Sequence, residues 1–113
     1  MKLTLPFPPS MNHYWRRHGH VIYVSAAGKK FQKDVQAAVV GLVQEPLTLR
    51  LRVSIVAHAP TKRRIDLDNR LKPALDAMTK AGVWVDDEQI DDLRIVRGEI
   101  VKGGRIEVTV EEF

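Results

Sequence analysis

Apolar residues recur at every second position in three segments of this 113-residue chain. The alternation is longest from Thr48 to Ala57, shorter from Arg105 to Glu111, and shortest from Lys2 to Leu5, which Pro6 ends. Side chains two residues apart point to the same face of a strand, so each segment predicts a strand with one face on a core. A further short strand is expected from Val21 to Val24.

Two other segments follow the helical period. Ser25 is a favourable N-cap, and a helix is expected from Ala26 to Val43 because apolar residues recur behind it at helical spacing: Phe31, Val35, Ala38, Val39 and Leu42. A second helix is expected from Asp68 to Thr79 or Lys80. Its buried stripe comprises Leu71, Ala74 or Leu75, and Met78, and Ala81-Gly82 is a typical helix end.

The remaining segments complete the topology. Three prolines within residues 6–9 exclude a helix from Phe7 to Asn12, and His13 to His20 has no helical period, so an extended segment and a loop are expected. Leu93 to Val101 is expected to pair with the last strand through a hairpin turn at Lys102-Gly103-Gly104. The order β-β-α-β-α-β-β predicts an α/β fold of the two-layer α+β type. Its mixed or antiparallel sheet of four to five strands would be covered by two helices on one face.

Composition places these elements in one small domain. A chain with 44% hydrophobic and 28% charged residues suits a single two-layer core, so residues 1–113 are expected to form one domain. No apolar run approaches the roughly 18 residues of a membrane span, and Pro6 comes too early for a signal peptide. The absence of cysteine excludes disulfides and thiolate metal sites. We therefore expect a cytoplasmic protein.

Charge is distributed unevenly along the chain. The net charge is +4, yet residues 66–92 contain eight of the 14 acidic residues and only three Lys or Arg, which gives −5 there and +9 elsewhere. A basic body around an acidic centre suits a polyanionic ligand that the body holds and the centre acts on. A solvated surface of mixed sign is the alternative, and charge alone does not distinguish the two.

The acidic stretch contains two candidate metal-binding segments. Asp66 and Asp68 point the same way if the chain is extended there, and Asp86 and Asp87 follow the second predicted helix. Two carboxylates about 5 Å apart repel by roughly 3 kcal/mol at an effective dielectric near 20, so their convergence requires a cation or a proton. Mg²⁺ uses oxygen ligands, typically few carboxylates with waters and a substrate phosphate. We expect Asp66, Asp68 and Asp87 to hold Mg²⁺, with Asp86 as a further candidate and Mn²⁺ as a substitute.

Several neighbouring residues have two interpretations each. Asp68 could cap the second helix, Lys72 could form i,i+4 ion pairs with Asp68 and Asp76, and Asn69 could simply occupy the first turn. In the functional interpretation, Lys72 neutralises a phosphate oxygen or orients the attacking water, and Asn69 supports a metal-binding carboxylate without touching the metal itself. The other acidic residues are expected to have surface or ion-pair roles: Asp76, Glu88, Asp91 and Asp92.

Cationic residues cluster in three segments outside the acidic stretch. We expect them to bind nucleic-acid phosphates: Arg16 and Arg17; Lys29, Lys30 and Lys33; Lys62, Arg63 and Arg64. Simple solvation is the alternative for the lysines of the first helix. Three aromatic residues accompany the first cluster, and each either stacks on an exposed base or belongs to the core: Tyr14, Trp15 and Tyr23.

The motif Arg63-Arg64-Ile65-Asp66-Leu67-Asp68-Asn69, followed by Lys72 and the segment Asp76 to Asp87, resembles the RusA family of Holliday-junction resolvases. The resemblance extends to Pro8-Pro9-Ser10-x-Asn12 and to Lys102-Gly103-Gly104-Arg105, and so covers nearly the whole chain. It implies a homodimeric, Mg²⁺-dependent endonuclease that nicks four-way junction DNA symmetrically in recombination and repair, and many such proteins are encoded by phages or prophages. The family's essential carboxylates match Asp66, Asp68 and Asp87, with Asp86 beside them and Lys72 as the supporting cation. Pro73, directly after Lys72, departs from the family pattern.

Two other functions fit the same residues. The first is a non-catalytic module that binds branched DNA, in which the acidic cluster is structural. The second is a phage regulatory or protein-interaction domain that does not bind DNA. Metal-dependent nicking of a synthetic junction separates the first from a resolvase, and a weak salt dependence of DNA binding would indicate the second.

Overall fold

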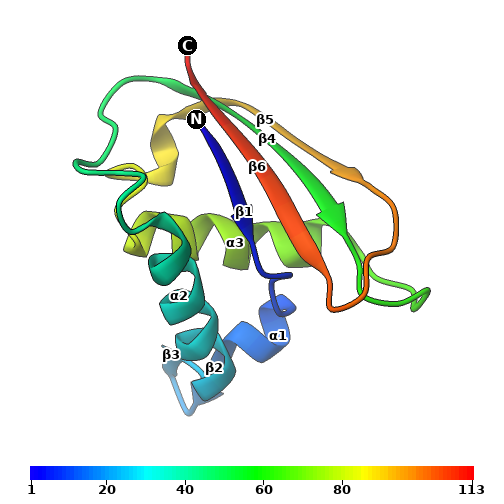
Figure 1. The fold of residues 1–113 in the computed structure, drawn as a ribbon. Coiled ribbons are helices and arrows are strands. Elements are labelled where there is room, and N and C mark those ends of the chain that lie inside the picture. The colour runs from blue at the N-terminus through cyan, green and yellow to red at the C-terminus, as the bar shows by residue number, and fades with distance from the viewer.

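A four-stranded mixed sheet forms one layer of the structure, a computed structural model that describes all 113 residues (Figure 1). The strands lie in the order β1 (Lys2–Leu5), β6 (Arg105–Glu112), β4 (Leu51–His58) and β5 (Ile90–Arg97). Strand β6 is antiparallel to both β1 and β4, whereas β4 and β5 are parallel. The predicted α+β fold with a mixed sheet is confirmed.

The predicted pairing of the last two strands is wrong. Strand β4 lies between β5 and β6, so these two strands do not pair. Strand β5 follows β4 through the helix α3 (Asp68–Lys80), and a crossover helix is the usual connection between parallel neighbours. Gly103 and Gly104 do form a turn, with φ of 82° and 71°, but it ends a connection that crosses from β5 to the far side of β4.

Two helices cover one face of the sheet, as predicted (Figure 1). Helix α2 (Ala26–Val39) begins after Ser25, whose hydroxyl accepts a hydrogen bond from the backbone N–H of Gly28 at 3.0 Å. The helix ends before the predicted Val43, because Gly41 adopts a left-handed φ of 82°. Helix α3 ends at Lys80, within the predicted range.

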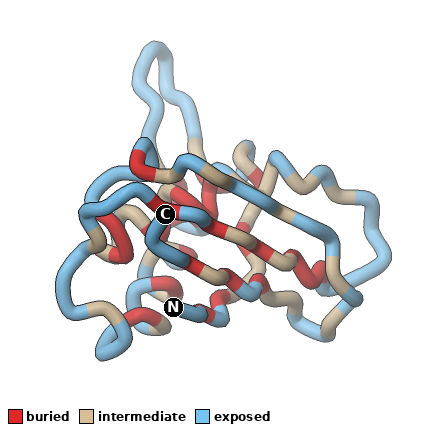
Figure 2. The backbone as a smooth tube through the Cα atoms, turned by 90° about the horizontal axis from the view of Figure 1, so that it is seen from above, coloured by how far each residue is buried: buried red, intermediate tan, exposed pale blue.

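The core lies between the sheet and these helices. Alternate residues of β4 are at most 1% exposed, namely Leu51, Val53, Ile55 and Ala57. Figure 2 shows buried stretches along the central strands and exposed backbone in the connections. Trp84, between α3 and β5, is 1% exposed, and its indole N–H donates to the Thr79 hydroxyl at 2.7 Å. None of the helices combines the length and the hydropathy that crossing a bilayer requires.

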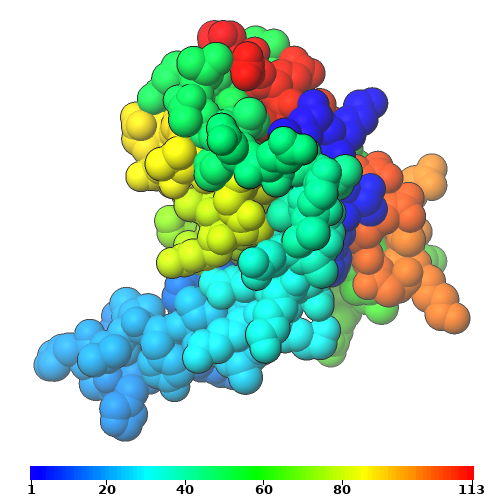
Figure 3. Space-filling model, turned by 60° about the vertical axis from the view of Figure 1, so that its left-hand side comes forward, coloured from blue at the N-terminus to red at the C-terminus, as the bar shows by residue number.

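A two-stranded hairpin projects from this body. The segment predicted as extended chain and loop contains a four-residue helix, α1 (Met11–Tyr14), and then β2 (Trp15–His18), which pairs with β3 (Val21–Val24). Only β3 was expected, because β2 mixes aromatic and cationic residues without a clear apolar alternation. Gly19 has φ of 61° in the two-residue turn, a conformation that glycine adopts readily. Figure 3 shows the hairpin extending away from the rest of the molecule.

Candidate active site

Helix α3 carries three charged residues along one side. Asp68, Lys72 and Asp76 are four residues apart, so they share a helix face and are separated by about 6 Å per step along the axis. Asp68 is the first helical residue, and the N-cap position is Leu67, so Asp68 does not cap the helix. Its carboxylate still lies at the positive end of the helix dipole, which favours an anionic group.

Lys72 has no carboxylate partner within the protein. It is exposed, and it appears in none of the salt bridges of the structure, so the ion-pair interpretation of this residue is wrong. Pro73 is buried inside the helix and leaves Lys72 on the exposed side. Asn69 occupies the first turn of α3. The ammonium group of Lys72 is therefore available to an anionic ligand.

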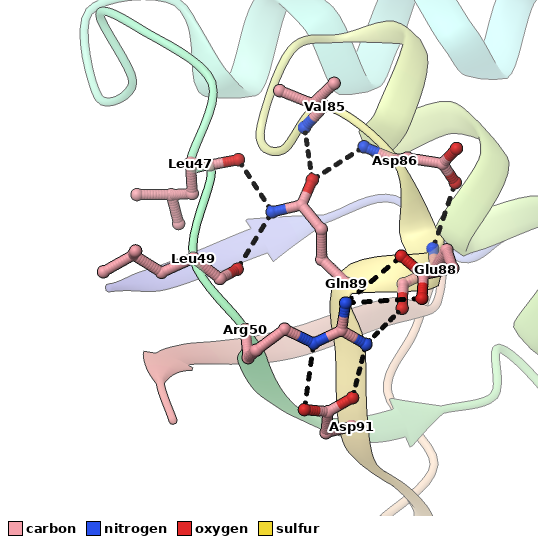
Figure 4. Close-up of polar contacts among 8 residues, drawn as sticks. All are labelled: Leu47, Leu49, Arg50, Val85, Asp86, Glu88, Gln89 and Asp91. Atoms are coloured by element: carbon pink, nitrogen blue, oxygen red, sulfur yellow. Dashed lines mark hydrogen bonds and ion pairs between the residues drawn. The ribbon is translucent and has the colours of Figure 1, made fainter.

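The loop after α3 is held by Gln89, which makes four hydrogen bonds (Figure 4). Its carbonyl oxygen accepts from the backbone N–H groups of Val85 at 3.0 Å and Asp86 at 2.8 Å. Its side-chain NH₂ donates to the carbonyl oxygens of Leu47 at 2.9 Å and Leu49 at 3.0 Å. Gln89 is only 7% exposed, so this buried amide fixes the loop against the segment that precedes β4.

This loop presents two adjoining carboxylates. Asp86 precedes a single 3₁₀ turn, η1 (Asp87–Gln89), and caps it by accepting a hydrogen bond from the backbone N–H of Glu88 at 3.0 Å. Partial desolvation raises the pKa of Asp87, and the Asp86 carboxylate raises it further through a hydrogen bond and its charge. The charge of Lys72 lowers the pKa of Asp87, and the charge of Asp76 raises it. These four residues are named the Asp87 centre: Lys72, Asp76, Asp86 and Asp87.

Asp76 is held in this centre by the buried Tyr14. The Tyr14 hydroxyl donates to the Asp76 carboxylate at 2.5 Å and accepts from the Gln32 side-chain amide at 2.7 Å. Burial and the hydrogen bond to Asp76 raise the pKa of Tyr14, so the hydroxyl keeps its proton. The expected surface role of Asp76 is thus wrong. Its four-residue spacing from Lys72 is the sequence signal that could have indicated this position, although the same spacing fits an ion pair.

Asp66 and Asp68 lie outside the Asp87 centre. Asp66 is exposed in the loop between β4 and α3, where the Arg97 guanidinium donates to the carbonyl oxygen of Ile65 at 3.0 Å. Neither carboxylate is among the groups that shift the pKa of Asp87. No three carboxylate or imidazole side chains lie close enough together to hold a metal ion. The four predicted ligands are therefore not gathered around one point.

The donor chemistry nevertheless fits a hard divalent cation. Asp86 and Asp87 lie side by side, and the unfavourable proximity of their charges contributes to the raised pKa of Asp87. A divalent cation would relieve this repulsion, and Mg²⁺ needs only one or two carboxylates when waters and a phosphate complete its coordination. The residues present are thus of the type that Mg²⁺ binds.

A pocket of about 430 Å³ lies between α1, the β2–β3 hairpin and α3. We name it the hairpin pocket, and its lining residues are Met11, Asn12, Trp15, Arg16, Arg17, Ile22 and Lys72. Lys72 belongs both to this pocket and to the Asp87 centre. The fold therefore brings two cations of β2 next to the cation of α3, with carboxylates on the adjoining surface.

The other predicted DNA-binding residues lie on separate exposed surfaces. Lys29, Lys30 and Lys33 lie on α2, where Lys30 pairs with Asp34 at 2.9 Å. The loop that leads from β4 to Asp66 carries three more exposed cations: Lys62, Arg63 and Arg64. This second group precedes one of the predicted metal ligands directly.

Three acidic residues have the predicted ion-pair roles. The Arg50 guanidinium binds both carboxylate oxygens of Asp91, at 3.0 and 2.5 Å, and also contacts Glu88 (Figure 4). Arg52 pairs with Asp92 at 3.1 Å. Strand β5 begins at Ile90, before the predicted start at Leu93, so Asp91 and Asp92 lie within the strand and not ahead of it. These acidic groups are neutralised within the protein.

The structure is a two-layer α+β domain in which carboxylates lie next to unpaired cations. This combination is typical of proteins that bind nucleic-acid phosphates. The comparison with protein families is more specific. The model of the family described as Endodeoxyribonuclease RusA matches residues 6–111. The chain belongs to this family.

Curated relatives agree over nearly the full length. The chain is 46% identical over 113 residues to the crossover junction endodeoxyribonuclease rusA of Enterobacteria phage HK97, covering 99% of this chain and 94% of the relative. It is 40% identical over 112 residues to the protein of the same name from Enterobacteria phage 82, and 41% identical over 112 residues to that of Escherichia coli K12. In both cases the match covers 98% of this chain and 93% of the relative.

Proposed function

We propose that this protein resolves four-way (Holliday) junction DNA by Mg²⁺-dependent hydrolysis of phosphodiester bonds, in recombination and repair. The substrate follows from the names of the relatives, and the metal from the oxygen donors of the candidate site. The observation that carries the proposal is the double position of Lys72, which lines the cationic pocket and also acts on Asp87. A DNA phosphate bound at Lys72 would lie beside the carboxylates.

The residues that meet the cation and the phosphate divide into two roles in this reaction. Asp86 and Asp87 would hold the cation, and Asp66 and Asp68, which lie outside the Asp87 centre in the structure, are proposed to join them as ligands in the DNA-bound protein. The cation would stabilise charge on the phosphate and lower the pKa of a bound water. Lys72 would bind a non-bridging oxygen of the scissile phosphate, since it has no competing carboxylate partner.

Two buried side chains would maintain the geometry of this centre. The amide of Gln89 fixes the loop that carries Asp87, and the hydroxyl of Tyr14 fixes Asp76 beside it. A rigid centre matters because catalysis through positioned charges depends on groups that need no reorganisation when the substrate binds.

The remaining cations would hold the arms of the junction. Each phosphate that a Lys or Arg neutralises on duplex DNA contributes about 0.9 to the slope of log K against log salt. The exposed cations of α2 and of the loop before Asp66 would add to the contacts made by the hairpin: Lys29, Lys30, Lys33, Lys62, Arg63 and Arg64. Binding is therefore expected to weaken steeply as the salt concentration rises.

A homodimer is part of the proposal. A four-way junction has approximate two-fold symmetry, and resolution needs two opposed cuts, which a two-fold dimer with one site per subunit provides. The exposed edge strand β5 supports a contact surface, since Leu93 and Val96 are 41% and 53% exposed there. Gel filtration with light scattering tests this, and an active monomer would contradict it.

The catalytic proposal is tested on a synthetic four-way junction with labelled strands. The parent protein is expected to nick two opposed strands with Mg²⁺ or Mn²⁺ and none with EDTA. Asp87→Asn and Asp66→Asn should abolish nicking and retain binding. Glu88→Gln is the matched control: it neutralises the next acidic residue, whose partner is Arg50, and should leave nicking unchanged.

A non-catalytic module for branched DNA is the second candidate, favoured by the separation of Asp66 and Asp68 from the Asp87 centre. The same assay distinguishes the two. Junction binding by the parent protein without any metal-dependent nicking would support the module and refute the nuclease. Equal nicking by the parent protein and by Asp87→Asn would refute the assigned centre.

A further inference from the structure

We propose that the hairpin pocket receives a single unstacked nucleotide at the branch point of the junction, with its base against Trp15 and its phosphate on the adjoining cations. The inference rests on the proposed function and deepens it, because it assigns junction selectivity to a defined pocket. It is carried by the shape of the pocket, by the chemistry of its lining and by the way in which Trp15 is held.

The size of the pocket suits one small ligand. Its volume of about 430 Å³ falls in the range of small-molecule sites, roughly 300–1,000 Å³. The hairpin forms one wall, and α1 and Lys72 form the other. A single nucleotide matches such a pocket, whereas a continuous duplex keeps the faces of its bases inside a stack and presents only base edges and the backbone to the protein.

The lining offers a partner for each part of a nucleotide. Trp15 and Ile22 supply apolar surface for a base, and an aromatic ring stacks on any base because every base has a π-face. Asn12 is exposed on α1, and its amide can donate to and accept from a base edge. Arg16 and Arg17 supply charge for the phosphate, and Lys72 adds a third cation.

The three cations of the pocket are free of internal partners. None of them forms a salt bridge, whereas Arg50 and Arg52 on the opposite end of the molecule each bind carboxylates of β5. The lining of the pocket contains three cations and no carboxylate, which indicates an anionic ligand from outside.

Trp15 is held in place by the buried residues behind it. Its ring packs edge-to-face on Tyr14, with centroids 4.4 Å apart at 66°, and Tyr14 is fully buried and hydrogen-bonded to Asp76. Tyr14 also packs against Phe31 of α2. The half-buried indole is thus pre-positioned at the pocket, and little conformational freedom remains to be lost when a base stacks on it.

This arrangement gives a physical reason for selectivity toward junctions. Removing a base from a continuous duplex costs its stacking and pairing, and one contact with Trp15 returns only part of that free energy. At a branch point stacking is already interrupted on one side of the base, so presenting the base costs less there and the same contact returns more of that cost. The pocket would therefore distinguish a junction from a linear duplex by the free energy needed to unstack and expose one base. The contacts with phosphates would be the same for the junction and the duplex.

The test compares binding to a four-way junction and to a linear duplex of the same sequence, in EDTA so that no strand is cut. Trp15→Ala is expected to weaken junction binding roughly 5- to 150-fold, the equivalent of about 1–3 kcal/mol for one stacked base. Binding to the duplex should change little. Tyr23→Ala is the matched control, since Tyr23 is exposed on the paired strand of the same hairpin and does not line the pocket.

A fluorescent base analogue reports occupancy of the pocket directly. With 2-aminopurine placed in turn at each position flanking the branch point, one position should change its emission on binding of the parent protein, and Trp15→Ala should remove that change. Ile22→Thr is a second variant: Ile22 is 59% exposed, so the β-branched replacement keeps the hairpin and removes apolar surface from the pocket. It should reduce the junction preference even if Trp15→Ala fails to fold.

The outcomes separate this inference from the proposed function. A parent protein that nicks junctions, together with an unchanged junction preference and 2-aminopurine signal in Ile22→Thr and in a folded Trp15→Ala, would overturn the pocket and leave the nuclease in place. A parent protein that never nicks junctions would overturn the function itself. Equal losses on junction and duplex would also refute the pocket, because they would assign Trp15 a general role in the fold.

Discussion

The hydrogen bond between Tyr14 and Asp76 links the N-terminal segment to the Asp87 centre, and deletion of a single atom removes it. Tyr14→Phe deletes the hydroxyl, and with it the bond to Asp76 and the weaker neutral bond from Gln32, and leaves the ring packed between Trp15 and Phe31. A hydrogen bond to a charged group contributes about 1.5–3 kcal/mol. The value should lie toward the lower end of this range, because Asp76 is partly exposed and water can replace the hydroxyl.

This free energy converts into a measurable shift. With an unfolding entropy of about 2.1 cal/mol/K per residue, a chain of 113 residues loses roughly 6–13 °C in Tm for 1.5–3 kcal/mol. Thermal melts followed by circular dichroism at neutral pH measure it. Tyr23→Phe is the control, because Tyr23 is exposed and its hydroxyl has no such partner. A Tyr14→Phe variant that melts with the parent protein would refute the assigned bond.

The pH dependence provides a second, independent readout. The pKa of Tyr14 is raised in the folded protein, first by burial and then by the hydrogen bond to Asp76. The stabilisation is therefore complete below the ordinary tyrosine pKa of about 10 and is lost as the pH rises above it. Tyr14→Phe should flatten this alkaline loss of stability, whereas Tyr23→Phe should retain it. An identical alkaline limb in parent protein and Tyr14→Phe would contradict the pKa assignment.

Three further predictions test the loop, the centre and the packing. Asp87→Asn should raise the Tm at neutral pH in EDTA, because the raised pKa of Asp87 means that folding disfavours its charged form. The gain in Tm should vanish below about pH 4, where the carboxyl is protonated in the unfolded chain too, and a lower Tm at pH 7 would contradict the assignment. Gln89→Leu should lower the free energy of unfolding in urea by about 2–4 kcal/mol, since four hydrogen bonds of about 1 kcal/mol each are lost in a buried site. The control Arg50→Gln changes an exposed side chain and should shift the urea midpoint little. Gly28→Ala should destabilise by about 1–3 kcal/mol despite the helix propensity of alanine, because the new Cβ would lie 2.6 Å from the carbonyl oxygen of Tyr14; a stabilised variant would refute this packing.

The spacing of apolar residues within each segment predicted most helices and strands, but it did not predict which strands pair. In β4, β6 and α3 one face is buried, and this burial fixes the spacing of apolar residues within each segment. Such spacing can be read from the sequence of that segment alone. The order of the strands depends on which segments meet in space. The turn at Gly103 and Gly104 looks like a hairpin locally, but α3 returns the chain to the open edge of β4 and so separates β5 from β6.

The types of residue in the candidate site could be predicted from the sequence, but their arrangement in space could be predicted only in part. The charge of Lys72 lowers the pKa of Asp87, and Asp86 lies directly before Asp87 in the chain, while the catalytic roles of all three stay predictions. Asp76 was missed because its burial partner, Tyr14, lies in a segment with no regular period. Asp66 and Asp68 remain predicted ligands, since their spacing shows that they can point together but not which other group they meet.

The acidic stretch is less negative in the folded protein than its sequence suggests, and this difference favours DNA binding. Residues 66–92 carry a net −5 by sequence, but Glu88, Asp91 and Asp92 pair with three arginines outside the stretch: Arg50, Arg52 and Arg94. What remains is five carboxylates against three cations within the stretch, a net −2. A polyanion approaching Lys72 therefore meets a weak local repulsion, which one divalent cation would cancel. Internal pairing thus removes the acidic groups that would oppose DNA and leaves those that could bind a metal, so the ion pairs of Arg50, Arg52 and Arg94 favour the chemistry proposed for the Asp87 centre.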